Sequence, residues 1–132
     1  MDRLAHKFEM IRQHVPKPIA DVRPNAQVGF VAFGTSQYAV EESRDQLRSE
    51  FGLETSYLRL KAFPFTQELV DFIRRHDRVY VIEQNRDAQL LSLMRMEFDP
   101  GDIAKLRSTL YYGGLPIDAR TITDDIVRQE GI

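Results

Sequence analysis

Apolar and polar residues alternate in a regular order after residue 26. Four apolar or alternating runs predict strands, at Val28–Phe33, Thr55–Leu60, Val79–Ile82 and Leu106–Tyr112. Between them, apolar residues recur at helical spacing and predict helices. The first helix follows Thr35 or Ser36 and stops at Gly52, the second begins at Thr66, the third covers about Ala88–Glu97, and the last covers Thr121–Gln129.

Strands that alternate with helices of this length are typical of parallel β-α units. Right-handed crossovers place such helices on both faces of the sheet. We therefore expect an α/β fold over residues 27–132, a three-layer domain with a mostly parallel sheet of about four or five strands. Phe65 is expected to pack on Val70 at the start of the second helix.

Residues 1–26 have a different pattern. Leu4, Phe8 and Ile11 suit one short amphipathic helix. The stretch Val15–Asn25 contains three prolines and is expected to form an extended connector, because proline excludes its predecessor from the helical region. Two interpretations stay open at this point: an ordinary N-terminal arm, or a linker that belongs to a larger polypeptide.

Composition excludes several classes of protein and several kinds of site. The 132 residues contain no cysteine, which excludes a disulfide scaffold, a thiolate zinc site, an iron–sulfur cluster held by this chain and a cysteine nucleophile. The longest apolar runs have about six residues, too few to span a bilayer. With 18 basic and 20 acidic residues, the charge balance gives no footprint for nucleic acid. The start of the chain has no apolar signal core, so a cytoplasmic protein is expected.

Ligands and partners of open α/β sheets usually meet the carboxyl ends of the strands. After the first predicted strand stand Gly34, Thr35 and Ser36. Glycine allows close backbone approach and a helix N-terminus favours an anion. The phosphate-binding motifs G-x-G-x-x-G and G-x-x-x-x-G-K-[ST] are absent, and an ordinary turn with a helix cap explains the same residues.

The second polar strand end is Glu83-Gln84-Asn85, with Gln89 shortly after it. A carboxylate directly behind an apolar strand has two interpretations. Glu83 can accept hydrogen bonds from nearby backbone amides and act as a structural latch, or it can face a subunit interface or a substrate channel.

Other polar residues give weaker signals. His6, His14 and His76 lack metal-ligand spacing and are expected to be solvated. One helix face is expected to be solvated and to carry ion pairs four residues apart, formed among Glu41, Glu42, Arg44, Asp45 and Arg48. Tyr112, Gly113 and Gly114 suit either a binding patch or a core aromatic with a turn. No complete catalytic set is present.

Four ordered segments, at Val28–Ser36, Leu58–Phe65, Val79–Leu90 and Tyr112–Pro116, carry a family resemblance. In this order and spacing they resemble the C-terminal domain of the alpha subunit of 2-oxoacid:ferredoxin oxidoreductases, most of all the 2-oxoglutarate type. The resemblance implies a fold like the C-terminal domain of transketolase. One departure is Ala88, where the family commonly has glycine.

The resemblance also implies a complex that oxidatively decarboxylates a 2-oxoacid onto coenzyme A and passes electrons to ferredoxin. Its cofactors are thiamine diphosphate, magnesium and at least one iron–sulfur cluster, held by the other alpha-subunit domains and the beta subunit. This chain would then hold no cofactor and be inactive alone, with an interface role. Its interface candidates are Gly34, Thr35, Ser36, Glu83, Gln84, Asn85, Gln89, Tyr112, Gly113 and Gly114.

Three alternatives stay open. The chain is either a piece of an alpha subunit or a split subunit of its own. A stand-alone module with the same fold would instead bind a small ligand or regulate another protein, since fold does not determine function. A homo-oligomer is compatible with each of these interpretations.

Overall fold

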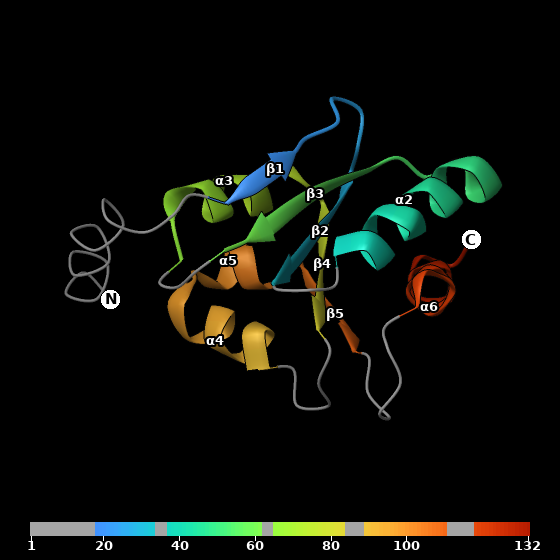
Figure 1. Ribbon diagram of the computed structural model, residues 1–132. Helices are drawn as coiled ribbons and strands as arrows, with labels where there is room; N and C mark the ends of the chain where they lie inside the picture. Colours follow the sequence, from blue (N-terminus) through green and yellow to red (C-terminus); the bar gives the residue numbers. More distant parts are fainter. Residues whose placement is uncertain (1–17, 34–36, 62–64, 84–88, 111–117) are drawn as a thin grey trace.

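The computed structural model describes residues 18–33, 37–61, 65–83, 89–110 and 118–132. Five strands and five helices occupy this part of the chain (Figure 1). Their bounds are β1 Ile19–Asp21, β2 Val28–Phe33, α2 Gln37–Phe51, β3 Thr55–Leu60, α3 Gln67–Arg75, β4 Arg78–Glu83, α4 Gln89–Glu97, α5 Pro100–Ile103, β5 Leu106–Leu110 and α6 Ala119–Glu130.

The strands form one sheet in the order β1-β3-β2-β4-β5. The pairs β2–β3, β2–β4 and β4–β5 are parallel, as the alternation of strands and helices predicts. β1 is antiparallel to β3, with Ala20 opposite Leu58. Within the stretch expected to be an extended connector, Ile19–Asp21 adds an edge strand to the sheet, whereas Pro24 and Asn25 form a turn.

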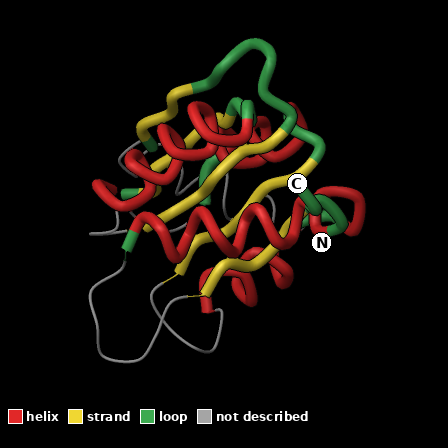
Figure 2. Tube along the Cα trace, turned by 90° about the vertical axis from the view of Figure 1, so that its right-hand side faces the viewer, coloured by secondary structure: helices red, strands yellow, loops and turns green. Residues whose placement is uncertain are grey.

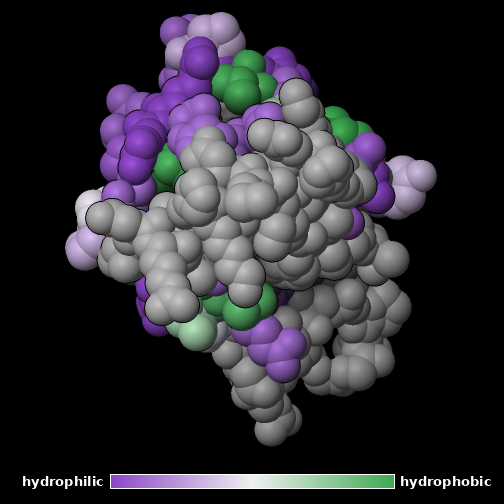
Figure 3. All heavy atoms as spheres, turned by 90° about the vertical axis from the view of Figure 1, so that its left-hand side faces the viewer, coloured by the Kyte–Doolittle hydropathy of each residue, from purple (hydrophilic) through white to green (hydrophobic). Residues whose placement is uncertain are grey.

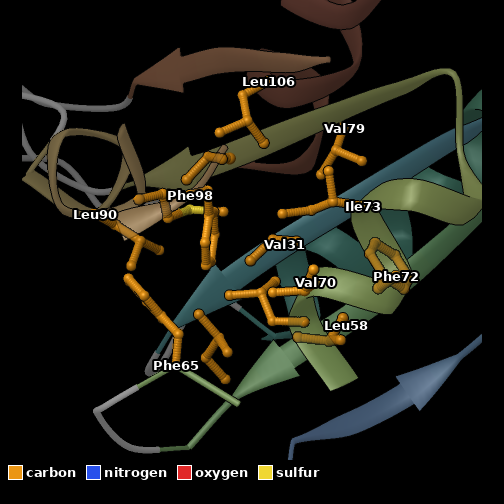
Figure 4. Close-up of a cluster of buried hydrophobic side chains, with 14 of the residues drawn as sticks. Val31, Leu58, Phe65, Val70, Phe72, Ile73, Val79, Leu90, Phe98 and Leu106 are labelled. Atoms are coloured by element: carbon orange, nitrogen blue, oxygen red, sulfur yellow. The ribbon is translucent and has the colours of Figure 1, made fainter. Parts of the chain in front are cut away.

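Side chains alternate between the two faces of the sheet and build two separate cores. Val31, Val79 and Val81 pack with residues of α3 and α4 (Figure 4). Phe30 and Tyr80 point to the other face and pack with residues of α2 and α6. Helices therefore cover both faces, which confirms the three-layer α/β architecture (Figures 1 and 2).

Helix ends follow the expected chemistry in most places. Gly52 directly after α2 has a φ of 68°, a left-handed value that glycine adopts without strain. Thr66 is the N-cap of α3, but its side chain forms no capping hydrogen bond. Phe65 and Val70 lie in the same core, as expected. Asp118 accepts a hydrogen bond of 2.9 Å from Arg120 N, so α6 begins two residues before Thr121.

The last helix is tied to the sheet by a buried carboxylate. Glu130 accepts hydrogen bonds from the Arg78 guanidinium, at 2.8 Å from Nε and from Nη2, and from the Tyr80 hydroxyl. Burial alone would raise the pKa of Glu130, but the bonds from Arg78 and Tyr80 outweigh it and hold the pKa below its ordinary value. Ser43 of α2 and Thr123 of α6 add a hydrogen bond of 2.8 Å.

Candidate functional site

The topology places a switch point between β2 and β4. The chain leaves β2 for β3 on one side, and then crosses to β4 on the other side. Ligand sites of open α/β sheets lie at this position, outside the carboxyl ends of the strands. Many of the predicted site residues follow these ends but lie outside the described residues: Gly34, Thr35, Ser36, Gln84, Asn85, Tyr112, Gly113 and Gly114.

Glu83 is described, and it forms a clear structural contact at this edge. It is the last residue of β4 and is 6% exposed. Its Oε1 accepts a hydrogen bond from Leu90 N at 2.5 Å, and its Oε2 accepts one from Leu91 N at 3.1 Å. These amides belong to the first turn of α4, which begins at Gln89. The structure therefore forms the latch that the sequence offered as one of two interpretations.

The hydrogen bonds of Glu83 affect which groups the start of α4 can bind. The first amides of a helix have no partner within the helix, and with the helix dipole they form a ready site for an anion. Here the carboxylate of Glu83 already occupies two of these amides. Gln89 is exposed beside them. Through these two amides, Glu83 holds the start of α4 on the sheet.

Tyr38 is an exposed aromatic residue that the sequence analysis did not select. It is the second residue of α2, which starts near the carboxyl end of β2, and it is 86% exposed (Figure 1). Large aromatic side chains are enriched where proteins meet. Tyr38 does not belong to the apolar positions that recur at helical spacing along α2. The hydrophobic pattern of the sequence therefore gave no reason to select it.

Other exposed apolar residues are scattered. Met96 is 72% exposed and Leu93 is 41% exposed, both on α4. In the described part of the face in Figure 3, hydrophobic residues form separate spots among hydrophilic ones. Single exposed apolar residues of this kind are normal on protein surfaces.

His76 corrects the expectation that all three histidines are solvated. It is 1% exposed, the centroids of its ring and of the Phe72 ring are 4.5 Å apart, and its Nδ1 is 2.7 Å from Phe72 O. Burial lowers the pKa of His76, since it penalises the cation. Space for both rings comes from Gly29, where a Cβ would lie 2.7 Å from Phe72 Cε1. The sequence signal that could have indicated this burial is Gly29 itself, a glycine among the larger residues of strand β2. His6 and His14 lie outside the described residues.

Arg44 corrects the expectation of a fully solvated helix face. It is 7% exposed, and its Nη2 donates to Thr55 O at 2.7 Å and to Asp21 Oδ2 at 3.0 Å. Burial alone would raise the pKa of Asp21, but Arg44 and Arg23 lower it overall. Arg44 thus connects α2 with β3 and with the edge strand β1. The salt bridge of Arg48 with Asp45 is exposed, but its spacing is three residues rather than four.

In the described part of the chain, no three His, Asp or Glu side chains are grouped so that they could hold a metal ion. The helices described there are too short or too polar to cross a lipid bilayer.

Solved structures share this fold. The 2-oxoglutarate:ferredoxin oxidoreductase of Magnetococcus marinus, solved with 2-oxoglutarate, coenzyme A and succinyl-CoA bound, matches with a TM-score of 0.77 and 23% identity. The match covers 97% of this chain and 23% of that one. The chain has the fold of a domain of that oxidoreductase.

A second match is the alpha chain of a probable 2-oxoacid ferredoxin oxidoreductase from Thermoplasma acidophilum. Its TM-score is 0.55 and its identity is 22%, with 88% of this chain and 98% of that chain covered. No family model and no curated protein sequence matches this chain. The family resemblance of the sequence motifs is therefore confirmed at the level of the fold.

Proposed function

We propose that this chain is the C-terminal domain of a 2-oxoacid:ferredoxin oxidoreductase alpha subunit, with 2-oxoglutarate as the expected substrate. The observation that carries the proposal is the likeness to the Magnetococcus marinus enzyme over 97% of this chain. The ordered sequence motifs named above support it independently of the structure. The complex would convert a 2-oxoacid and coenzyme A to acyl-CoA and carbon dioxide and pass two electrons to ferredoxin.

In this proposal the domain has a structural role. Its carboxyl edge, the edge of the sheet where the carboxyl ends of the parallel strands lie, packs against the rest of the enzyme. Glu83 supports that role, because its carboxylate binds the chain's own helix amides and leaves them unavailable to a phosphate. Tyr38 offers an exposed aromatic at the same edge, so we add it to the interface candidates.

The cofactors belong to the other domains in this proposal. An iron–sulfur cluster requires thiolate or histidine ligands, and this chain has no cysteine and no described group of metal-binding side chains. These observations support placing the cluster and the magnesium ion outside this chain. The remaining alpha-subunit domains and a beta subunit would hold thiamine diphosphate, magnesium and the cluster, and would receive coenzyme A and ferredoxin.

The first experiment identifies the native polypeptide and its partners. The mass of the polypeptide that contains this sequence would be measured after purification from source cells. A larger chain with a second subunit supports an alpha-subunit domain, and a 15.3 kDa chain with the same partners supports a split subunit. The small chain found alone, with calorimetric binding of thiamine diphosphate, coenzyme A or a 2-oxoacid, would replace the proposal by a stand-alone binding module.

A second experiment tests the interface. Tyr38→Ser is expected to weaken assembly of the purified complex at least about tenfold, which equals about 1.4 kcal/mol. Met96→Ser is the matched control, since Met96 is also large and exposed but lies in the last turn of α4, away from the carboxyl edge. Equal effects of the two substitutions would refute the placement of the interface.

A further inference from the structure

Among the described strands, β1 contributes least to the two cores. It has three residues, all of them exposed, and it pairs with β3 at the edge of the sheet (Figure 1). The strands β2 to β5 have five or six residues each and place buried side chains in the cores. Separation of β1 from β3 would therefore leave both cores assembled.

The side-chain contacts that fasten this segment lie at its carboxyl end. Asp21 Oδ2 accepts a hydrogen bond of 3.0 Å from Arg44 Nη2 of α2. Val22 packs against the core on the opposite face of the sheet, and Arg23 N donates to Ser56 Oγ at 2.9 Å. These contacts, together with the backbone pairing to β3, hold residues 19–23 on the domain from both faces of the sheet.

Arg44 makes the strongest of these contacts. Its side chain is 7% exposed, and it also donates to Thr55, at 3.1 Å from Nε to Oγ1 and at 2.7 Å from Nη2 to O. The planar guanidinium reaches Thr55 and Asp21 at the same time, which a lysine ammonium would not do. Glu41 Oε1 lies farther away, at 3.6 Å from Nη1. A buried cation that loses its counter-ion is costly, so Arg44 favours the position of the segment in which Asp21 lies against it.

A small polar cavity beside Arg44 lowers the cost of separating the two side chains. Its volume is about 30 Å³, and Arg48 and Glu54 are among the residues that line it. A cavity of this size has room for a water molecule. Water can therefore take the place of Asp21 at the guanidinium when β1 leaves, while the bonds to Thr55 stay in place.

We infer that residues 19–23 are a strap that opens while the rest of the domain stays folded, and that Arg44 is its lock. The closed strap fixes the place where the chain before residue 19 reaches the domain, and the open strap releases that chain. For an alpha subunit this consequence rests on the proposed function: the strap would determine whether the domain is held rigidly or loosely by the polypeptide that precedes it.

Hydrogen exchange of the full chain in urea tests the opening. Local opening exposes little surface, so its free energy changes little with urea, whereas unfolding of the domain depends steeply on urea. Between no urea and about 1 M urea, the protected amides of β1 are expected to accelerate less than about twofold and those of β4 at least about tenfold. Equally steep acceleration in β1 would overturn the inference, because the strap would then open only with the whole domain. Exchange of all β1 amides at the rate of a free peptide would also overturn it, because the strap would not be closed.

Asp21→Asn and Arg44→Lys test the lock. The first removes the carboxylate charge and the second removes the guanidinium fork, and each is expected to raise the exchange rates of the β1 amides at least about fivefold, after correction for intrinsic rates. The double variant is expected to exceed the larger single effect by less than about twofold, because both substitutions break one contact. Effects that multiply in the double variant would mean that the two residues act separately, contrary to the inference.

Asp45→Asn is the matched control. Asp45 also pairs with an arginine, Arg48, but its side chain is 71% exposed, so the substitution is expected to change exchange in β1 by less than about twofold. Exchange of the β4 amides in the same samples reports whether each variant is folded. If Arg44→Lys unfolds the chain, the comparison of Asp21→Asn with Asp45→Asn decides, and equal effects of these two would overturn the inference.

The strap and the proposed function can fail separately. All of these measurements use the 132-residue chain without partners. Purification of the native polypeptide without a second subunit would refute the proposed function and leave the strap unaffected. Steep urea dependence of exchange in β1 would refute the strap and leave the proposed function unaffected.

Discussion

The contact of Glu83 with α4 leads to a quantitative prediction. Replacing Glu83 by glutamine keeps the size of the side chain but changes what its two terminal atoms can do. The oxygen of glutamine can still accept from Leu90 N or from Leu91 N. Its NH₂ group, a donor, must then face the other amide, and one N–H of a buried helix start loses its partner.

The expected cost follows from these bonds. A hydrogen bond to a charged group contributes about 1.5–3 kcal/mol, and leaving a buried donor unpaired costs a similar amount. Loss of a negative charge at a helix start adds about 0.3–1 kcal/mol. We therefore expect Glu83→Gln to lower the free energy of unfolding by about 2–4 kcal/mol, and Glu83→Ala to lower it by at least as much, because neither amide keeps its partner.

Equilibrium unfolding in urea measures this loss. With a slope of about 2 kcal/mol per M for a chain of this size, the midpoint should fall by about 1–2 M. Hydrogen exchange at Leu90 and Leu91 should accelerate more than exchange elsewhere in the sheet. Glu42→Gln is the control, since Glu42 is exposed on α2 and its loss should change stability by less than about 0.5 kcal/mol. A Glu83→Gln midpoint within about 0.25 M of the unchanged chain would refute the reasoning.

Two further predictions concern the packing between α3 and the sheet. The pKa of His76 lies below the free value of 6.5, so its contribution to stability is complete above about pH 6.5 and is lost as the pH falls toward the lowered folded pKa. Urea midpoints should therefore fall as the pH drops below about 6.5, and His76→Asn, which cannot titrate, should remove part of this slope. An unchanged slope would contradict a buried neutral histidine. Gly29→Ala should cost about 1–3 kcal/mol because its Cβ meets Phe72, whereas Gly101→Ala in α5, with nothing within 4 Å, should be neutral or stabilising; equal effects would show that the space beside Phe72 is not tight.

Periodicity predicted the strands and the layers because both depend on local spacing. A run such as Val79–Ile82 can only be buried on both faces, and β4 has both of its faces covered. The strands β2 and β3 have the predicted bounds, whereas the bounds of β4 and α6 differ from the prediction by one or two residues. The edge strand β1 was missed as a strand because three residues carry no period of their own and become a strand only by pairing with β3.

The candidate site was predictable only in part. The sequence pointed to Glu83 because a carboxylate directly behind an apolar strand is unusual. It could not decide between a latch and an interface residue, because that depends on which groups lie beside the carboxylate in the folded chain. The fold brings the amides of Leu90 and Leu91 to its oxygens. Most of the other predicted interface residues lie outside the described part of the chain, and their role stays a prediction.

The order of apolar and polar residues by itself determined the fold class, the helices on both faces and the family resemblance, because these depend on period and motif spacing along the chain. Tertiary structure alone decided which polar residues are buried. Arg44 and His76 look like surface residues in the sequence, yet β3 supplies the acceptors for Arg44, and Gly29 supplies the space for His76. Burial of a polar group depends on partners and volume from distant segments, and a local pattern contains neither.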